Sequence, residues 1–185
     1  MIVFSSVSFA YPEKPVLHDF SMHVLPGEQV RLTGASGAGK TTVLKLILGL
    51  KRPQSGEIRV NAGRVSVLFQ EDRLLPFYTV AGNLDLFCDP ARARELLDEL
   101  GIASAADQYP SQLSGGIARR AALARALTLD ADLYLFDEPF TGLDAESRKT
   151  CLSVLRRRLA DRTAVFVSHL AEDDEELPLR EIPVR

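Results

Sequence analysis

A glycine-rich stretch, GASGAGKTT at residues 34–42, has the residue types and spacing that bind the phosphates of a nucleotide. It lies between an alternating apolar run and a second apolar run, an order that predicts strand, loop and helix. The N–H groups of such a loop point into one concavity, and the helix N-terminus adds its positive dipole end. Lys40 would reach the β- and γ-phosphates, and the Thr41 hydroxyl would hold Mg²⁺. At an average glycine usage of about 7%, the four fixed positions of this pattern would arise by chance in roughly one chain of this length in a hundred. This favours a phosphate site over a turn without a ligand.

Two adjacent carboxylates, Asp137 and Glu138, follow the apolar run LYLF at residues 133–136. That run is typical of a central parallel strand that is buried on both faces. Charges at the end of such a strand are unfavourable unless they meet a cation or carry out chemistry. In phosphate-loop enzymes an acid in this place binds Mg²⁺, and a neighbouring carboxylate can deprotonate water. We therefore assign Asp137 to the metal and Glu138 to the water, against the alternative of a solvated strand end.

Two further polar residues, Gln70 and His169, follow apolar runs that predict strands at residues 64–69 and 163–167. Ligands of open parallel sheets lie beyond the carboxyl ends of the strands. Gln70 would therefore touch Mg²⁺ or an attacking water, and His169 would reach the γ-phosphate or that water. Taken alone, each is better explained as an ordinary polar residue at the end of a strand.

A second anion-receptive helix start is predicted at Ser114-Gly115-Gly116, ahead of an alanine-rich run at residues 118–129. Ser114 is a favourable N-cap, and a cap without a ligand is the better explanation when this turn stands alone. Tyr11 lies in a turn ahead of the phosphate loop. Its ring could stack on a base for about 1–3 kcal/mol; the alternative is a tyrosine packed at the turn.

Apolar periodicity predicts the elements that position these residues. Strands are expected at residues 2–9, 16–24, 29–33, 57–60, 64–69, 133–136 and 163–167. Helices are expected at residues 42–50, across much of residues 72–129, and after Asp144, a candidate N-cap.

Length and composition restrict the classes of protein. A chain of 185 residues suits one domain. The sequence contains no run of roughly 18 or more apolar residues, the length that is needed to span a bilayer. Residues 1–4 also lack the start of a signal peptide, so we expect a cytosolic location. Cys88 and Cys151 have no metal-ligand spacing and are expected to be reduced. The net charge of −3 disfavours non-specific nucleic-acid binding, and the acidic run at residues 172–176 is expected to be a solvated loop.

Taken in order, these motifs resemble those of the ATPase subunit of an ATP-binding cassette (ABC) transporter. The resemblance covers nearly the whole chain, and LSGG at residues 113–116 is far more specific to this family than the phosphate loop alone. Its other parts are Tyr11, residues 34–42, Gln70, residues 134–138, GLD at residues 142–144 and SH at residues 168–169. The stretch LFQEDRLLP at residues 68–76 is similar to the import ATPases of the nitrate, sulfonate and taurine group.

The resemblance implies an α/β fold with ATP and Mg²⁺ as cofactors. A P-loop NTPase core with a mostly parallel sheet would carry an N-terminal antiparallel β subdomain and an inserted α-helical subdomain at residues 72–128, with residues 1–185 forming one domain. The residues implied in catalysis are Glu138, His169 and Gln70; those for the metal are Thr41, Gln70 and Asp137; and those for ATP are Tyr11, Gly34, Ala35, Ser36, Gly37, Ala38, Gly39, Lys40, Thr41, Thr42, Ser114, Gly115 and Gly116.

The resemblance also implies a head-to-tail homodimer, or a pair with a related subunit. Each ATP would lie between residues 34–42 of one chain and Ser114 of the other, and hydrolysis through Glu138 would release the dimer. Opening and closing would drive a polytopic membrane permease subunit docked near residues 70–83. The chain would lie in the cytoplasm on the inner face of the cell membrane, without a nucleic-acid partner. An importer would add a substrate-binding protein.

Three residues depart from the family pattern. Ile117 stands where glutamine or methionine is usual, and Ala118 and Arg119 replace the more usual basic residue and glutamine. From the short stretch after His169, we expect no regulatory domain of the kind that many relatives carry.

Two alternatives remain at this point. A soluble ABC ATPase of DNA repair, chromosome organisation or translation is disfavoured, because Lys40 and Asp137 are only 97 positions apart and one cassette is present. A cassette that binds ATP without hydrolysing it is disfavoured by the presence of Lys40, Asp137, Glu138 and His169 together.

Overall fold

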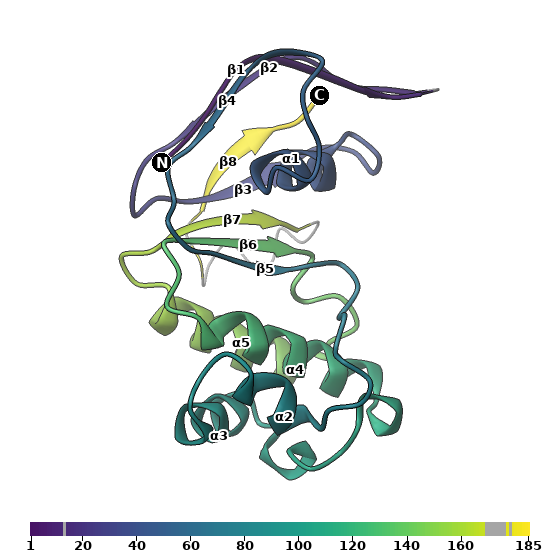
Figure 1. Ribbon diagram of the computed structural model, residues 1–185, viewed down its shortest axis with the longest axis vertical. Helices are drawn as coiled ribbons and strands as arrows, with labels where there is room; N and C mark the ends of the chain where they lie inside the picture. Colours follow the sequence, from purple (N-terminus) through teal and green to yellow (C-terminus); the bar gives the residue numbers. More distant parts are fainter. Residues whose placement is uncertain (13, 169–176, 178) are drawn as a thin grey trace.

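A five-stranded parallel sheet runs across the middle of the molecule (Figure 1). The computed structural model describes residues 1–12, 14–168, 177 and 179–185. The strands lie in the order β5-β6-β7-β3-β8, with every adjacent pair parallel. Their bounds are Gln29–Thr33 for β3, Val65–Leu68 for β5, Leu133–Asp137 for β6, Thr163–Val167 for β7 and Arg180–Pro183 for β8. Every residue of β6 and β7 is buried, as expected for parallel strands covered on both faces.

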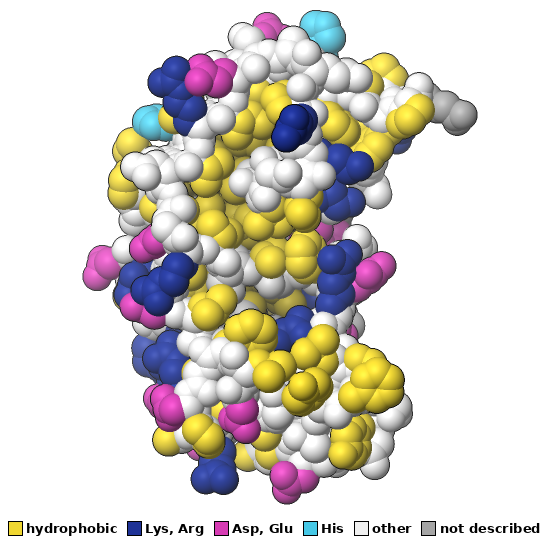
Figure 2. Space-filling view, in the orientation of Figure 1, with side chains coloured by type: hydrophobic (Ala, Val, Ile, Leu, Met, Phe, Trp, Pro, Cys, Tyr) yellow, Lys and Arg dark blue, Asp and Glu magenta, His cyan; other side chains and the backbone are white. Residues whose placement is uncertain are grey.

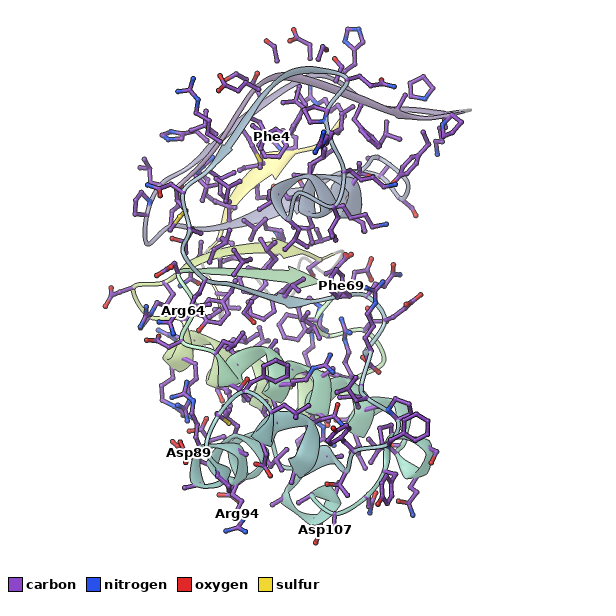
Figure 3. The ribbon with its side chains drawn as sticks, in the orientation of Figure 1. Phe4, Arg64, Phe69, Asp89, Arg94 and Asp107 are labelled. Carbon is purple, nitrogen blue, oxygen red and sulfur yellow. The ribbon has the colours of Figure 1, made fainter. Side chains whose placement is uncertain are left out.

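An antiparallel sheet covers one face of the parallel sheet. Its order is β2-β1-β4, with bounds Ile2–Tyr11 for β1, Lys14–Val24 for β2 and Ser55–Val60 for β4. Helix α1 (Lys40–Ile47) lies between the two sheets (Figure 1). Apolar side chains from all three layers form one core, to which Phe4 of β1 contributes (Figure 3).

Helices cover the other face. α4 (Gly115–Thr128) and α5 (Ala145–Arg158) lie against the parallel sheet, and α2 (Val80–Asp85) and α3 (Pro90–Glu99) lie beyond them (Figure 1). Two single 3₁₀ turns, Ala103–Ala105 and Pro110–Gln112, connect α3 to α4. A second core joins these helices to the sheet, where the rings of Phe136 and Phe166 stack at 4.8 Å between centroids. None of the helices in the described part of the chain is long and apolar enough to cross a membrane.

The structure confirms the predicted α/β class, with its parallel sheet and N-terminal antiparallel sheet. β3 and β7 have the predicted bounds, and Ser114 and Asp144 cap α4 and α5. α1 begins two residues earlier than predicted, because Gly39 closes the loop directly before Lys40. Both cysteines are free thiols, as expected.

The strand β8 was not predicted from the sequence. It has four residues at the edge of the sheet, of which only Ile182 is buried, so periodicity gives no signal. The strands β1 and β2 also extend further into their connecting turn than predicted, to Tyr11 and from Lys14. The acidic run at residues 172–176 lies outside the described residues.

Candidate functional site

A cleft of about 300 Å³ lies at the carboxyl ends of the parallel strands, where the sequence predicts the ligand. The phosphate loop follows β3, Glu138 follows β6 and Val167 ends β7, so the parallel arrangement itself brings them together. The lining residues are Tyr11, Lys14, Val16, Ser36, Gly37, Gly39, Lys40, Thr41, Thr42, Gln70, Glu138 and Val167.

The phosphate loop connects β3 to α1 and depends on its glycines. Gly37 and Gly39 have φ angles of 78° and 103°, which other residues rarely adopt. A Cβ atom at Gly39 would also lie 2.5 Å from Val16 Cγ1, because the loop packs closely against β2. Ser36 and Gly37 are exposed, so the backbone at the tip of the loop is open to a ligand.

Lys40 lies inside this loop. Its side chain is buried, and its ammonium donates hydrogen bonds to the carbonyl oxygens of Gly34 at 2.8 Å and Ala35 at 3.0 Å. These contacts hold a positive charge at the floor of the cleft, beside the N-terminus of α1. Both features attract phosphate. Ala38 instead packs against the core beneath the loop.

A hydroxyl and a carboxylate meet at the base of the cleft. Thr41 Oγ1 donates to Asp137 Oδ1 at 3.2 Å, across 96 positions of sequence. Burial raises the pKa of Asp137, and the nearby charge of Glu138 also raises it, while Thr41 and Arg119 act in the opposite direction. A cation would relieve this unfavourable buried charge.

These residues fit Mg²⁺, which prefers one or two carboxylates together with substrate phosphates and water. Asp137 and the Thr41 hydroxyl supply two oxygen ligands, and Gln70 lines the same cleft. No group of three or more His, Cys, Asp or Glu side chains that could hold a metal occurs among the described residues. Asp137 and Thr41 would therefore supply only part of the ligands of a bound Mg²⁺, and substrate phosphates and water would have to supply the others.

Glu138 is held in an unusual backbone conformation at the edge of the cleft. Its φ angle is 52°, and its backbone N–H donates to the carbonyl oxygen of Val167 at 2.8 Å. Its carboxylate accepts a hydrogen bond from Thr141 Oγ1 at 3.0 Å. The hydrogen bond from Thr141 thus holds the Glu138 side chain at the edge of the cleft.

The hairpin of β1 and β2 forms the outer wall of the cleft. Tyr11 packs edge-on against Phe9 at 5.0 Å between ring centroids, and Lys51 Nζ lies 5.5 Å from the centre of its ring. Tyr11 therefore both packs at a turn and lines the cleft. Lys14 was missed at the level of sequence, although a lysine three residues after the aromatic residue could have suggested a second phosphate contact.

Ser114, Gly115 and Gly116 do not line this cleft. Ser114 and Gly115 are exposed, and Ser114 Oγ accepts from the backbone N–H of Ile117 at 3.4 Å as the N-cap of α4. The chain thus has two helix N-termini suited to binding anions, those of α1 and α4, but only that of α1 lies in this cleft. His169 lies outside the described residues.

Comparisons with known proteins agree with this geometry. The family model described as ABC transporter matches residues 17–141. The chain is 42% identical over 176 residues to the aliphatic sulfonates import ATP-binding protein SsuB 1 of Rhodococcus jostii, covering 90% of this chain and 72% of that protein. It is 43% identical over 180 residues to the SsuB protein of Delftia acidovorans, covering 93% and 73%. It is 40% identical over 197 residues to the Nod factor export ATP-binding protein I of Paraburkholderia xenovorans, covering 95% and 65%.

A solved structure shows the same fold. It is described as the dimeric structure of a post-hydrolysis state of the ATP-binding cassette MJ0796 bound to ADP and Pi. The TM-score is 0.88 at 25% sequence identity, and the match covers 100% of this chain and 94% of the other. The fold, the cleft and the relatives lead to one conclusion: this chain belongs to the ATPase family of ABC transporters.

Proposed function

We propose that this chain is the ATP-binding and ATP-hydrolysing subunit of an ABC transporter and drives a separate membrane subunit through ATP-dependent dimerisation. One observation carries the proposal: a single cleft is lined by Lys40, Thr41 and Glu138, with Asp137 bonded to Thr41. A phosphate loop alone would fit a protein that only binds nucleotide. The second carboxylate adds the group that hydrolysis needs.

The residues have distinct roles in this proposal. Lys40 and the loop N–H groups bind the phosphates, Thr41, Gln70 and Asp137 hold Mg²⁺, and Glu138 orients and deprotonates the attacking water. When bound, Mg²⁺ neutralises charge on the transferred phosphoryl group. Tyr11 and Lys14 lie on the outer wall, where a base or phosphate oxygen would contact them. His169, which lies outside the described residues, is proposed to contact the γ-phosphate or the attacking water.

A head-to-tail dimer would complete each site. The exposed N-terminus of α4, at Ser114, Gly115 and Gly116, is available to the nucleotide of a second chain. The similar solved structure is described as dimeric and bound to ADP and Pi, which supports a dimer for this chain as well. ATP would then join the two chains, and hydrolysis would separate them.

The membrane subunit is proposed to dock on the helical region near residues 70–83. Large apolar side chains are exposed there and on the neighbouring end of α2, and Figure 2 shows apolar side chains gathered on the helical end of the molecule. They are Leu75, Phe77, Tyr78, Leu86 and Phe87. A largely apolar groove of about 240 Å³ beside Phe69 and Phe87 would accept apolar side chains of the membrane subunit. An exposed apolar patch of this kind indicates a binding surface.

The relatives suggest import of a sulfonate or a similar anion, since two of those described above are named for sulfonate import. We propose the nitrate, sulfonate and taurine group for this chain, with a substrate-binding protein as a further partner. Residues 1–185 would form one domain, with residues 72–128 as its helical part, on the inner face of the cell membrane.

Glu138→Gln tests the catalytic assignment. This variant should bind Mg-ATP, hydrolyse it at least a hundredfold more slowly, because a general base is worth about 10²–10⁴ in rate, and accumulate dimer in sedimentation experiments. Glu57→Gln is the matched control, because Glu57 is exposed on β4 and paired with Arg59 on the same strand. A monomeric Glu138→Gln protein at saturating Mg-ATP would refute the proposed dimer.

Lys40→Ala and Ser114→Arg test the shared site. Each variant alone should lose cooperative ATP turnover, Lys40→Ala through lost phosphate binding and Ser114→Arg through a blocked partner surface. A mixture of the two should form heterodimers with one intact composite site. Absence of any nucleotide-dependent heterodimer would contradict the head-to-tail arrangement.

A further inference from the structure

Arg119 connects α4 to both strand ends that carry the catalytic cleft. The residue is buried on α4, five positions after the Ser114 cap. It stands where glutamine is usual in the family pattern, and the sequence alone assigns it no role in the site. Phe69, at the end of β5, marks where the sheet meets the helical part of the molecule (Figure 3).

The guanidinium group makes six hydrogen bonds to two segments of the site. Toward the end of β6, Nη2 donates to the carbonyl oxygens of Asp137 and Glu138, both at 2.7 Å, and Nε donates to that of Pro139 at 3.3 Å. Toward the end of β5, Nη1 donates to the carbonyl oxygens of Phe69 at 2.8 Å and Gln70 at 3.3 Å, and to Asp72 Oδ1 at 2.9 Å.

This arrangement bears directly on the conformation of Glu138. A φ angle of 52° persists in a non-glycine residue only where the surroundings hold it. Hydrogen bonds hold Glu138 on both sides, from its N–H to Val167 and from Arg119 to the carbonyl oxygens of Asp137 and Glu138. Arg119 therefore donates two of the hydrogen bonds that hold the backbone at Asp137 and Glu138, and the N–H of Thr141 donates another to Glu138.

We propose that Arg119 is a positioning residue that fixes Glu138 and the loop at Gln70 relative to helix α4. The inference rests on the proposed function, because it concerns the rate of ATP hydrolysis. A planar guanidinium can bridge several carbonyl oxygens at once, whereas a glutamine side chain carries a single NH₂ group. The arginine thus joins segments that a glutamine could not join alone.

A purely structural ion pair is the competing explanation. Only one of the six contacts is to a charged group, Asp72, whose side chain is partly exposed. The other five go to backbone carbonyls of the segments that carry Gln70, Asp137 and Glu138. The distribution of contacts favours positioning of the site.

Arg119→Met separates the two explanations, because it keeps an unbranched apolar stem and removes every donor. The affinity for a β,γ-imido analogue of ATP, measured without Mg²⁺, should stay within threefold, because Lys40 and its loop hold the phosphates, whereas Arg119 bonds the segments of Gln70 and Asp137. The kcat for ATP should fall at least tenfold, since a misplacement of about 1 Å can lower a rate about a hundredfold. A smaller loss of kcat in the folded variant, or an equal loss of affinity, overturns the proposal.

Arg119→Lys keeps the proposal testable if Arg119→Met does not fold. Lysine retains the charge but donates from a single nitrogen and cannot bridge both segments. A kcat at least threefold lower with unchanged analogue affinity supports the proposal, and an unchanged kcat overturns it.

Arg158→Met is the matched control. Arg158 is also largely buried and bonds Glu95 and Glu99, which ties α5 to α3 away from the cleft. It should lower the unfolding temperature and leave kcat within twofold. A loss of kcat equal to that of Arg119→Met would overturn positioning as the cause. If the wild-type protein neither bound nor hydrolysed ATP, the proposed function would fail instead, which is a separate outcome.

Discussion

Gly115 offers a sharp test of the shared-site proposal, because its own chain does not require a glycine there. It is the first residue of α4, it is exposed, and its φ angle is not in the left-handed region. A Cβ atom built at Gly115 meets nothing within 4 Å. Alanine is favoured over glycine in a helix interior by about 0.5–1 kcal/mol, which is an upper limit for the first position of a helix. For a chain of this size the unfolding temperature should therefore rise by up to about 4 °C.

The same substitution should weaken the dimer. If the N-terminus of α4 contacts the nucleotide of a second chain, the added methyl group enters a packed interface. Overpacking costs about 1–3 kcal/mol, which corresponds to roughly 5- to 150-fold weaker association. Gly115→Ala should therefore be more stable as a monomer and poorer as an ATP-dependent dimer.

Two measurements on Gly115→Ala check both halves of this argument. Calorimetry without nucleotide gives the unfolding temperature, and sedimentation equilibrium at saturating Mg-ATP, with Glu138→Gln as background, gives the dimer affinity. Gly49→Ala is the control, because a Cβ atom there also meets nothing, but its φ angle of 68° makes alanine strained. That variant should lose stability and keep the dimer. If Gly115→Ala gains stability and dimerises as tightly as before, the N-terminus of α4 does not face a partner's nucleotide.

Three further predictions follow from single side chains. Burial raises the pKa of Asp137, so its carboxylate holds a proton more tightly in the folded chain than in the unfolded chain. The charged carboxylate therefore lowers the stability of the fold near pH 7, and this loss disappears as the pH falls through the raised pKa. Asp137→Asn should accordingly raise the unfolding temperature of the nucleotide-free protein near neutral pH, by an amount that shrinks toward acid pH; a difference independent of pH would contradict this. Burial also raises the pKa of the Cys151 thiol to about 12, so a thiol reagent should modify Cys88 first and Cys151 only after unfolding, and two equally fast thiols would exclude this structure. Lys14→Ala should weaken ATP binding about two- to fivefold, as for an exposed charge contact, and the effect should diminish with added salt; equal affinities at low salt would remove Lys14 from the site.

The parts of the site that could be predicted are those determined by neighbours in sequence. The phosphate loop is local, since its glycines, Lys40 and the start of α1 lie within a few residues. The positions of Gln70 and Glu138 followed from one further rule, that parallel strands end at the same edge of a sheet. Both line the cleft as expected.

The missed residues depend on contacts that sequence spacing does not encode. Arg119 sits among alanines on a helix, and sequence spacing does not reveal its hydrogen bonds with partners 18 to 50 positions away. β8 pairs with β3, which lies about 150 positions earlier in the chain, and has too few residues for a periodic pattern. Lys14 gains its importance only through the close approach of the β1–β2 hairpin to the phosphate loop.

The two helix N-termini differ in what surrounds them, and this difference bears on how the chain would bind ATP. The N-terminus of α1 lies in a cleft with a buried lysine, whereas that of α4 is exposed and lies outside the cleft. A helix end carries only about half an elementary charge, and its effect falls off within the first turn. The N-terminus of α4 would therefore hold a phosphate weakly alone and usefully only when another body anchors that phosphate. Lys40 and its loop are such an anchor, but they lie in the chain's own cleft. In the proposed head-to-tail dimer, a second copy would present that anchor to Ser114, and both helix ends would then bind phosphate.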